Sequence, residues 1–534
     1  MQTPRQTLKN IFDMPPGEYC HFGLTTGLVR LLKDCAEAPS RVSLFFNVDG
    51  LPISKSSKLE LWPIQCQVKE FGSIPPFLVG AYCGIAKPLC PNNFLRKFID
   101  ELLLLLRESI TVNDTVVQVS FEAIICDAPA RAYVYLIKSH TGYSGCPKCT
   151  DEGDYDRNRL YYSTCVGTIR TDESFRAQSD ADHHRGVSIL TELPINIVNC
   201  APLDYMHLVC LGVVKKLLLL WLSGPLSVRL GPASRNELAR RSTALQRSIP
   251  GEFARKPRGV DEVERWKATE FRLFVLYTGP VILETVLTQP LHLNFLTLHC
   301  ALSILTDSEL CRTEYGYASS LLAHFVETFA ALYGQHFVSY NVHGLLHLAE
   351  DVKNHGPLDS FSAFPFENNM KALKRQLKKP GATLAQLYNR HCEKELAGIK
   401  DEHHVSRFGL KNPRNRAAIH PLCKQPTYDM FSCPDFTLAT VGPDRFCMVD
   451  QQMVAVEYFA RLRSSEQACV VGHVLTSERD LFQKPFPSSM IGTSIVSQGS
   501  ELRVWPLRDI RKLVGLPYGH DGLRWVIMPM KHLR

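Results

Sequence analysis

Three acidic residues, far apart in the chain, are of the right type to share one metal site. Asp49 and Asp127 each end an apolar run, 42–49 and 116–127, and Glu367 lies just inside a predicted helix. Carboxylate oxygens are preferred ligands of Mg²⁺, and two such ions about 4 Å apart support phosphodiester cleavage. The three residues therefore predict phosphoryl-transfer chemistry with two Mg²⁺ or Mn²⁺ ions held by Asp49, Asp127 and Glu367.

The elements around the two aspartates predict how they could meet. Turn-rich segments separate three strands, and a helix leads to a fourth strand. These elements are expected at 42–49, 59–68, 77–85, 91–107 and 116–126. A crossover helix places the fourth strand beside the first and parallel to it. The carboxyl ends of both strands then lie together, as in the opening order of an RNase H-like fold.

Composition and periodicity divide the rest of the chain. A Cys- and His-containing loop segment precedes a long helical stretch, and short strands predominate near the end. The expected segments are an N-terminal segment with a helix near 27–35 (1–40), the first part of the core (41–139), a Cys/His loop segment (140–200), a helical insertion (201–345), closing core helices (346–405) and a β-rich C-terminal domain (406–534). The expected helices are 128–138, 205–222, 233–248, 262–286, 293–306, 314–333, 364–379 and 384–400, and the expected C-terminal strands include 453–459, 468–475 and 525–530.

The predicted fold class is therefore α/β. An RNase H-like mixed sheet core is interrupted by a large all-α insertion and a zinc-binding loop segment. A small β-rich C-terminal domain follows.

The overall composition is that of a soluble globular protein. The 534 residues are 45% hydrophobic and 21% charged, and the net charge of +7 permits a nucleic-acid partner without requiring one. Eighteen cysteines without a signal peptide favour a reducing compartment. The most apolar stretch, 213–222, contains Lys215 and Lys216, so we expect no membrane span.

A second metal site is predicted in the loop segment. Cys146-Pro-Lys-Cys149 has the spacing of a zinc knuckle. Nearby residues that could complete four ligands are Cys165, His183, His184 and His140. Coincidence remains the alternative to a structural zinc, because only the first pair is closely spaced. A thioredoxin-like role is disfavoured, since the motif does not open a helix after a strand.

Further polar and basic residues are placed at helical spacing. Asp204 and His207, three residues apart, share a helix face, and the ordinary interpretation is a helix-start aspartate and a core histidine. Lys267 and Arg272 lie in a stretch with Trp266 and Phe271, where a solvated face over an aromatic core is favoured over DNA contact. The basic helix after Glu367 is placed to bind DNA phosphates through Lys371, Lys374 and Arg375.

Ordered blocks over about residues 15–400 resemble the CACTA (En/Spm-like) DNA transposases of the RNase H-like DDE superfamily. The blocks are Asn47-Val-Asp49, Cys126-Asp127 with Cys146-Pro-Lys-Cys149, Asp204-Tyr-Met-His207, Asn341 through Gly356-Pro357, and Phe364-Pro-Phe-Glu367. The resemblance implies that Glu367 is the third catalytic acid and that Asp204 and His207 support the site. It also implies nuclear DNA cleavage and strand transfer on double-stranded DNA, with at least a dimer to pair two ends.

Two other functions stay open. One is a host-adopted, catalytically silent derivative that binds DNA or protein. The other is a zinc-stabilised helical scaffold without a nucleic-acid role, which salt-dependent DNA binding would distinguish. Only about 40 residues precede Asp49, and they contain no recognisable DNA-binding module. End recognition is therefore assigned to the C-terminal domain, to a partner protein or to a missing N-terminal exon.

Overall fold

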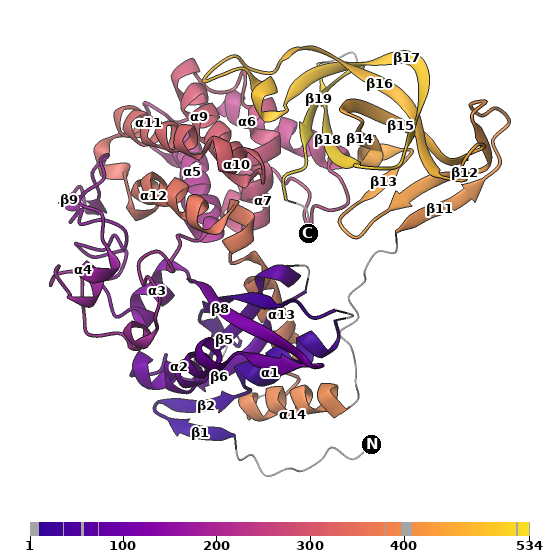
Figure 1. The fold of residues 1–534 in the computed structure, drawn as a ribbon. Helices are drawn as coiled ribbons and strands as arrows, with labels where there is room; N and C mark the ends of the chain where they lie inside the picture. The colour runs from indigo at the N-terminus through magenta and orange to yellow at the C-terminus, as the bar shows by residue number, and fades with distance from the viewer. Residues whose placement is uncertain are drawn as a thin grey trace. The chain divides into compact units, whose positions relative to one another are not determined.

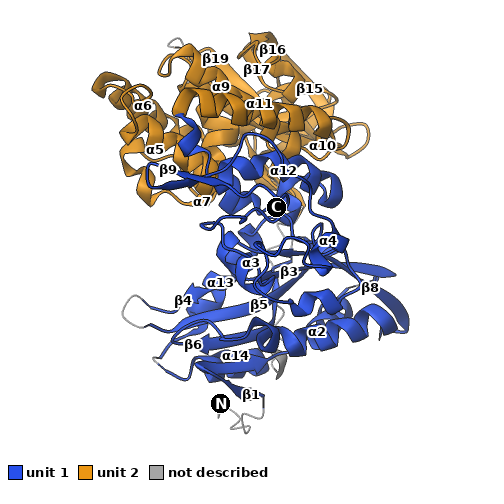
Figure 2. Cartoon of the chain, turned by 90° about the vertical axis from the view of Figure 1, so that its left-hand side faces the viewer, with its two compact units in different colours: residues 1–209, 334–403 blue, residues 210–333, 404–534 orange. Residues whose placement is uncertain are grey.

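The computed structural model describes residues 10–35, 37–54, 58–72, 74–379, 381–396, 408–519 and 522–532, apart from the side chains of 394–396. The fold is mixed α/β with a β-rich C-terminal region. The chain forms two compact units, each made of two segments (Figure 2). Unit 1 comprises Met1–Val209 and Gly334–His403, and unit 2 comprises Cys210–Tyr333 and His404–Arg534. The end of the predicted helix 384–400 lies outside the described residues.

A mixed sheet forms the centre of unit 1 (Figure 1). Its strands are β1 (Ile11–Met14), β2 (Gly17–His21), β3 (Arg41–Val48), β4 (Leu51–Pro52), β5 (Glu60–Val68), β6 (Phe77–Gly84), β7 (Ile110–Val112) and β8 (Thr115–Ile125). The order is β1-β2-β6-β5-β3-β8-β7, with β4 on β5. β3 and β8 are parallel, and the other pairs are antiparallel. The predicted parallel pairing of the two aspartate strands is confirmed.

The N-terminal segment contributes to this sheet, which the sequence pattern does not predict. β1 and β2 form a hairpin, and β2 extends the sheet by pairing with β6. Each of these strands has only four or five residues, too few to show a clear alternation of apolar and polar positions. Residues 10–35 are therefore part of the core.

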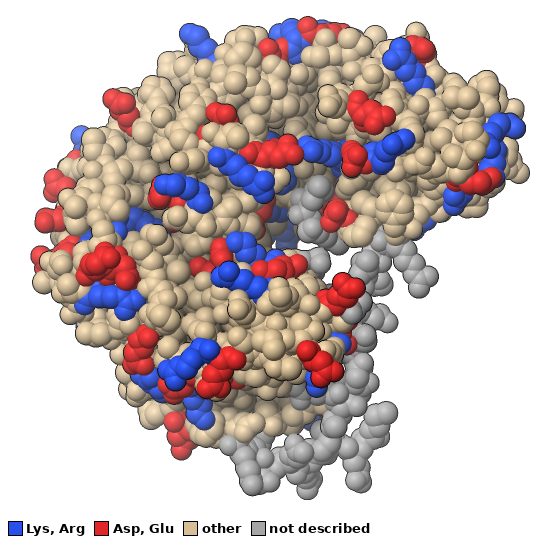
Figure 3. Space-filling model, viewed as in Figure 1, with Lys and Arg blue, Asp and Glu red and all other residues tan. Residues whose placement is uncertain are grey.

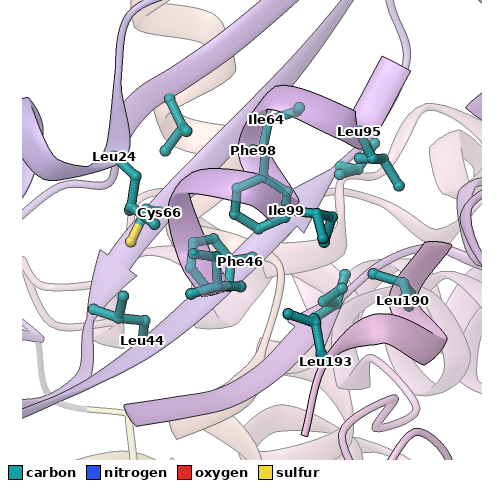
Figure 4. Close-up of a cluster of buried hydrophobic side chains, with 14 of the residues drawn as sticks. Leu24, Leu44, Phe46, Ile64, Cys66, Leu95, Phe98, Ile99, Leu190 and Leu193 are labelled. Atoms are coloured by element: carbon teal, nitrogen blue, oxygen red, sulfur yellow. The ribbon is translucent and has the colours of Figure 1, made fainter. Parts of the chain in front are cut away.

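Helices cover both faces of the sheet. α1 (Leu24–Lys33) and α2 (Pro91–Glu108) pack their apolar stripes on one face, where Leu24, Phe46 and Phe98 meet (Figure 4). Each fully buried side chain of this size contributes roughly 1.5–3 kcal/mol. α13 (Phe364–Gln376) and α14 (Thr383–Leu396) place leucines against the other face. The helices on both faces therefore fix the ends of β3 and β8, which Asp49 and Asp127 follow.

The remaining elements of unit 1 are short apart from one helix. They are η1 (Lys69–Phe71), α3 (Ala128–Val134), β9 (Asp154–Asp156), β10 (Arg159–Tyr161), α4 (Asp172–Arg176), η2 (Ile189–Glu192), η7 (Gln335–Phe337), α12 (Tyr340–His355) and η8 (Leu358–Phe361). α3 ends before the predicted boundary, because Leu136 adopts a left-handed φ of 52° that no α-helix can continue.

Unit 2 contains the helical insertion. Its elements are α5 (Lys215–Ser223), α6 (Pro232–Ala244), η4 (Leu245–Ser248), η5 (Val260–Arg265), α7 (Ala268–Leu273), η6 (Phe274–Thr278), α8 (Gly279–Ile282), α9 (Gln289–Thr306), α10 (Leu310–Thr313) and α11 (Tyr315–Tyr333). The predicted helix 262–286 is helical without a gap over 268–282, through α7, η6 and α8, and the extended residues Trp266 and Lys267 separate it from η5. A π-helix, η3 (Met206–Val214), runs from unit 1 into α5. Met206–Ser223 has the length and apolar composition of a membrane span, but 61% of it is buried inside the fold, as in a core helix.

The C-terminal part of unit 2 is β-rich, as predicted. Its elements are β11 (Gly409–Arg414), β12 (Cys423–Ser432), β13 (Thr437–Ala439), η9 (Gly442–Arg445), β14 (Phe446–Val449), β15 (Gln452–Leu462), β16 (Ala468–Asp480), η10 (Ser488–Ile491), β17 (Ser494–Pro506), β18 (Arg511–Tyr518) and β19 (Arg524–Pro529). Strand order runs β11-β12-β15-β14-β18-β19-β17-β16. Because β16 also pairs with β15, the strands from β15 to β16 close into a barrel.

Candidate metal centres

Asp49, His207 and Glu367 form an acidic cluster in unit 1. Each offers one ligand atom, and these atoms all lie within 4.8 Å of one another. Asp49 follows the end of β3, and Glu367 lies in the first turn of α13. His207 is the second residue of the π-helix η3. All three are partly exposed, so the cluster is accessible to a ligand from solvent.

Asp127 lies beside this cluster. β3 and β8 pair in parallel with Asn47 opposite Ile125, so Asp49 and Asp127 both lie two residues beyond the last pair. The Asp127 Oδ1 accepts a hydrogen bond from Ala130 N at 2.7 Å and caps α3. The structure therefore brings the two predicted aspartates to the same edge of the sheet, with one oxygen of Asp127 engaged in capping.

Asp204 holds His207 in place. Its buried carboxylate accepts the His207 backbone N–H at 2.9 Å and contacts His207 Nδ1 at 2.6 Å through Oδ2. Its Oδ1 accepts Ala363 N at 2.7 Å, just before α13. A carboxylate on the second ring nitrogen is the usual support of a metal-bound histidine. Asp204 thus orients His207 and anchors the helix that carries Glu367.

The pKa shifts of the cluster reflect the negative charge gathered around it. Burial, together with the negative charge of Asp127, raises the pKa of Asp49 to about 7, and the charge of Glu367 adds to this rise. Burial lowers the pKa of His207, yet the hydrogen bond and charge of Asp204 outweigh it and raise this pKa to about 9. Negative charge is therefore concentrated here beyond what the protein neutralises, and a divalent cation would relieve it.

A buried chain of amides connects the Glu367 helix to the sheet. Asn369 Nδ2 donates to Gln65 Oε1 at 2.8 Å, and Gln65 Nε2 donates to Asn47 Oδ1 at 3.0 Å. Asn47 Nδ2 then donates to Ile125 O at 2.8 Å. Asn47 and Gln65 are buried, so the two bonds of Asn47 are shielded from water, whereas the bond from Asn369 is partly buried. The chain fixes α13 against the strands that end in Asp49 and Asp127.

A second centre is formed by Cys146, Cys149, His343 and His347, all buried. Tetrahedral Zn²⁺ with thiolate and imidazole ligands requires S···S, S···N and N···N separations of roughly 3.8, 3.5 and 3.3 Å. The thiols lie 3.7 Å apart, and each lies 3.3 or 3.5 Å from an imidazole Nε2. The two Nε2 atoms are 3.4 Å apart. Four of the six separations of such a tetrahedron are therefore present, and all four atoms lie within 4.8 Å of one another, so the group could hold a metal ion such as zinc.

The surroundings of this centre favour metal binding. His343 Nδ1 contacts Ser163 O at 3.0 Å, which leaves Nε2 facing the thiols. The hydrogen bond from Cys146, together with those from the two imidazoles, lowers the pKa of the Cys149 thiol. A thiolate and a fixed imidazole tautomer are the forms that bind a metal ion.

The other predicted zinc ligands do not join this centre. Cys165 is exposed, and His183 Nδ1 contacts Ser144 O at 2.7 Å. His184 packs edge-on against Phe175, and His140 packs edge-on against Tyr340. The prediction of these ligands is wrong because the two residues that complete the centre, His343 and His347, come from α12 and not from the nearby loop. His343 and His347 have the i, i+4 spacing of a metal-binding histidine pair, a signal present in the sequence.

The basic residues expected to bind DNA lie in different units. Lys371, Lys374 and Arg375 are exposed on α13, and Lys374 Nζ donates to Pro52 O at 2.8 Å. In unit 2, Lys267 is exposed beside buried Trp266. Phe271 is buried as well, and Arg272 is half-buried. The aromatic core expected for that stretch is confirmed.

Comparison with known proteins finds a family match in the C-terminal part of the chain. Residues 414–530 match a family model described as a domain of unknown function, DUF8592. The match covers most of the C-terminal barrel and neither metal centre. No curated protein matches the chain.

Proposed function

We propose that this protein is a transposase-like enzyme that cleaves and joins DNA at the acidic cluster. The observation that carries the proposal is the convergence of Asp49, His207 and Glu367 within 4.8 Å, beside Asp127. The strand order β6-β5-β3-β8, with β8 parallel to β3, is consistent with an RNase H-like core. The resemblance to CACTA transposases supports the same site residues.

The cluster residues fit Mg²⁺ or Mn²⁺, because two carboxylates and an imidazole with one anchored nitrogen form a suitable ligand set. Asp49 and Glu367 would supply oxygen ligands, with Asp127 as a further oxygen donor. When bound, divalent cations activate the attacking oxygen and stabilise the leaving oxygen. Asp204 keeps His207 oriented, since it holds Nδ1 and leaves Nε2 toward a ligand.

The reaction proceeds in two displacements at one site. A water oxygen attacks the phosphorus at the element end, and the bond to the 3′ oxygen breaks to leave a 3′-hydroxyl and a 5′-phosphate. The freed 3′-hydroxyl then attacks a phosphorus of target DNA and displaces its 3′ oxygen. The exposed cations of α13, on the same helix as Glu367, would hold the phosphate backbone.

DNA affinity is expected to come from local contacts like those of the exposed cations on α13. On the face drawn in Figure 3, lysines and arginines are interspersed with aspartates and glutamates. Phosphate binding there would be modest and salt-dependent. The proposal includes nuclear localisation, at least a dimer to pair two ends, and a partner protein or the C-terminal barrel for end recognition.

The test is nicking and strand transfer with Mg²⁺ or Mn²⁺ on DNA bearing the terminal inverted repeats. Asp49→Asn, Asp127→Asn and Glu367→Gln should each abolish both steps. Glu350→Gln, an exposed acid paired with Lys353 on α12, is the matched control and should stay active. Activity that survives Asp127→Asn and Asp49→Asn would refute the assignment. Salt-sensitive duplex binding without cleavage would instead identify the silent, DNA-binding derivative.

A further inference from the structure

A buried aspartate that belongs to neither metal centre lies between them. Asp351 is on α12, four residues after His347 and eight after His343. This spacing puts the carboxylate on the helix face that carries both imidazoles. Its side chain is 2% exposed, so its charge must be satisfied by the protein.

One carboxylate oxygen of Asp351 reaches the Cys2His2 centre. Oδ1 accepts a hydrogen bond from Lys148 Nζ at 2.6 Å. Lys148 stands between the two ligand cysteines of the knuckle, and its Nζ also donates to Val198 O at 3.1 Å. The position of this ammonium group therefore depends on the conformation that the knuckle adopts around its metal.

The other oxygen of Asp351 reaches toward the acidic cluster. Oδ2 accepts Leu203 N at 2.8 Å, and the next residue is Asp204. Asp204 in turn contacts His207 Nδ1 at 2.6 Å and accepts Ala363 N at 2.7 Å. Charge-assisted hydrogen bonds on Asp351 and Asp204, joined by the backbone between Leu203 and Asp204, therefore connect the knuckle to both His207 and the start of the Glu367 helix.

We infer that Asp351 is a positioning residue that couples metal occupancy of the Cys2His2 centre to the geometry of the acidic cluster. A buried ion pair adds little net stability, because desolvation offsets its attraction, but it specifies one arrangement of the groups around it. Removal of the metal frees the knuckle, displaces Lys148 and loosens the anchor of Leu203 and Asp204. The inference rests on the proposed function only where divalent-metal binding at the acidic cluster is the readout.

The test uses the full chain with Co²⁺ in the Cys2His2 centre, where thiolate-to-cobalt absorption reports occupancy. Mn²⁺ binding at the acidic cluster is titrated by electron paramagnetic resonance, and the part lost in Asp49→Asn defines that site. Hydrogen exchange of peptides containing Leu203 and Ala363 gives a second readout that needs no metal at the acidic cluster.

The deciding variant is Lys148→Met with Asp351→Leu, which removes both charges and preserves volume. We expect it to keep the cobalt absorption, to weaken Mn²⁺ binding by roughly 10-fold and to speed exchange at Leu203 and Ala363. Glu350→Gln should change none of these. If the double variant fails to bind Co²⁺, the same measurements are made on Lys148→Met alone. This variant keeps the hydrogen bond from Leu203 N to Asp351.

The outcomes separate the two hypotheses. Wild-type Mn²⁺ affinity and exchange that are the same with and without Co²⁺ would overturn the coupling, as would a double variant within about twofold of wild type. Absence of Asp49-dependent Mn²⁺ binding, with exchange that still responds to Co²⁺, would remove the proposed function and leave the coupling intact.

Discussion

The Cys2His2 centre and the acidic cluster lie in the same unit but have opposite surroundings. The first is buried on all four ligands, and four of its six ligand separations match those of a tetrahedral site. The second is partly exposed and combines carboxylates with one histidine. Closed tetrahedral sets stabilise folds, whereas sites that keep positions open for water or substrate carry out reactions. The contrast agrees with the proposal that the first centre is structural and the second carries out the reaction.

The largest expected effect is loss of the Cys2His2 centre. Cys149→Ser should abolish stoichiometric zinc and remove much of the stability of unit 1, because structural zinc contributes on the order of 10 kcal/mol. Metal analysis and thermal unfolding measure both. Cys165→Ser, at an exposed cysteine outside the centre, is the control and should change neither. A Cys149→Ser protein that keeps one zinc would contradict the closed-site assignment.

The acidic cluster should behave in the opposite way. Asp49→Asn should lower DNA cleavage by at least about 100-fold, since the bound metal charge supplies several kcal/mol in the transition state. Thermal stability should stay unchanged or rise, because the substitution removes a partly buried like charge beside Asp127 and Glu367. Parallel cleavage assays and unfolding curves test this, and a large loss of stability would count against it.

Metal affinity at the acidic cluster should depend on pH. Burial raises the pKa of Asp49 to about 7, and a metal ion binds only the deprotonated carboxylate. His207, whose pKa is about 9, must also lose its proton to bind, so Mn²⁺ affinity should rise with pH throughout pH 6 to 8, by at least about tenfold per unit. Titrations between pH 6 and 8 measure the slope. Asp49→Asn should remove the contribution of this carboxylate, and an unchanged slope in that variant would contradict the assignment.

The smallest effect is expected at the amide chain. Asn369→Leu leaves Gln65 Oε1 without its donor and should cost about 1 kcal/mol in the free energy of unfolding. It should also weaken Mn²⁺ binding, because α13 would no longer be fixed against the sheet. Asn368→Ala, at the exposed neighbouring position, is the matched control. Equal effects of both substitutions would show that the chain does not position Glu367.

The sequence predicts the acidic cluster better than the Cys2His2 centre. The parallel pairing that brings Asp49 and Asp127 together follows from a local strand, helix and strand order. Glu367 and the role of Asp204 with His207 needed family resemblance, since an acid near a helix start is common. The thiol pair is visible as a motif, whereas its histidines come from another segment that no local pattern connects to it.

In the fold, the sequence likewise predicts long elements better than short ones. Long elements such as α2 and β8 match their predicted ranges within a residue or two. The strands β1 and β2 are too short to show an alternation of apolar and polar residues. The position of their hairpin is set by the pairing of β2 with β6. The predicted helix 262–286 is helical without a gap over 268–282, where the π segment η6 joins α7 to α8, and it begins later than predicted because Trp266 and Lys267 have extended backbone.

The separation of the ligand pairs along the chain has a consequence for synthesis. Cys149 and His343 are 194 residues apart, with the helical insertion between them. At roughly 5–20 residues per second, the ribosome would take about 10–40 s to deliver the histidines after the cysteines. During that interval the knuckle has two free thiols and half a ligand set. Capture of the metal is therefore a late step in biogenesis. It occurs only after the second chain segment of unit 1 has been synthesised and has joined the first.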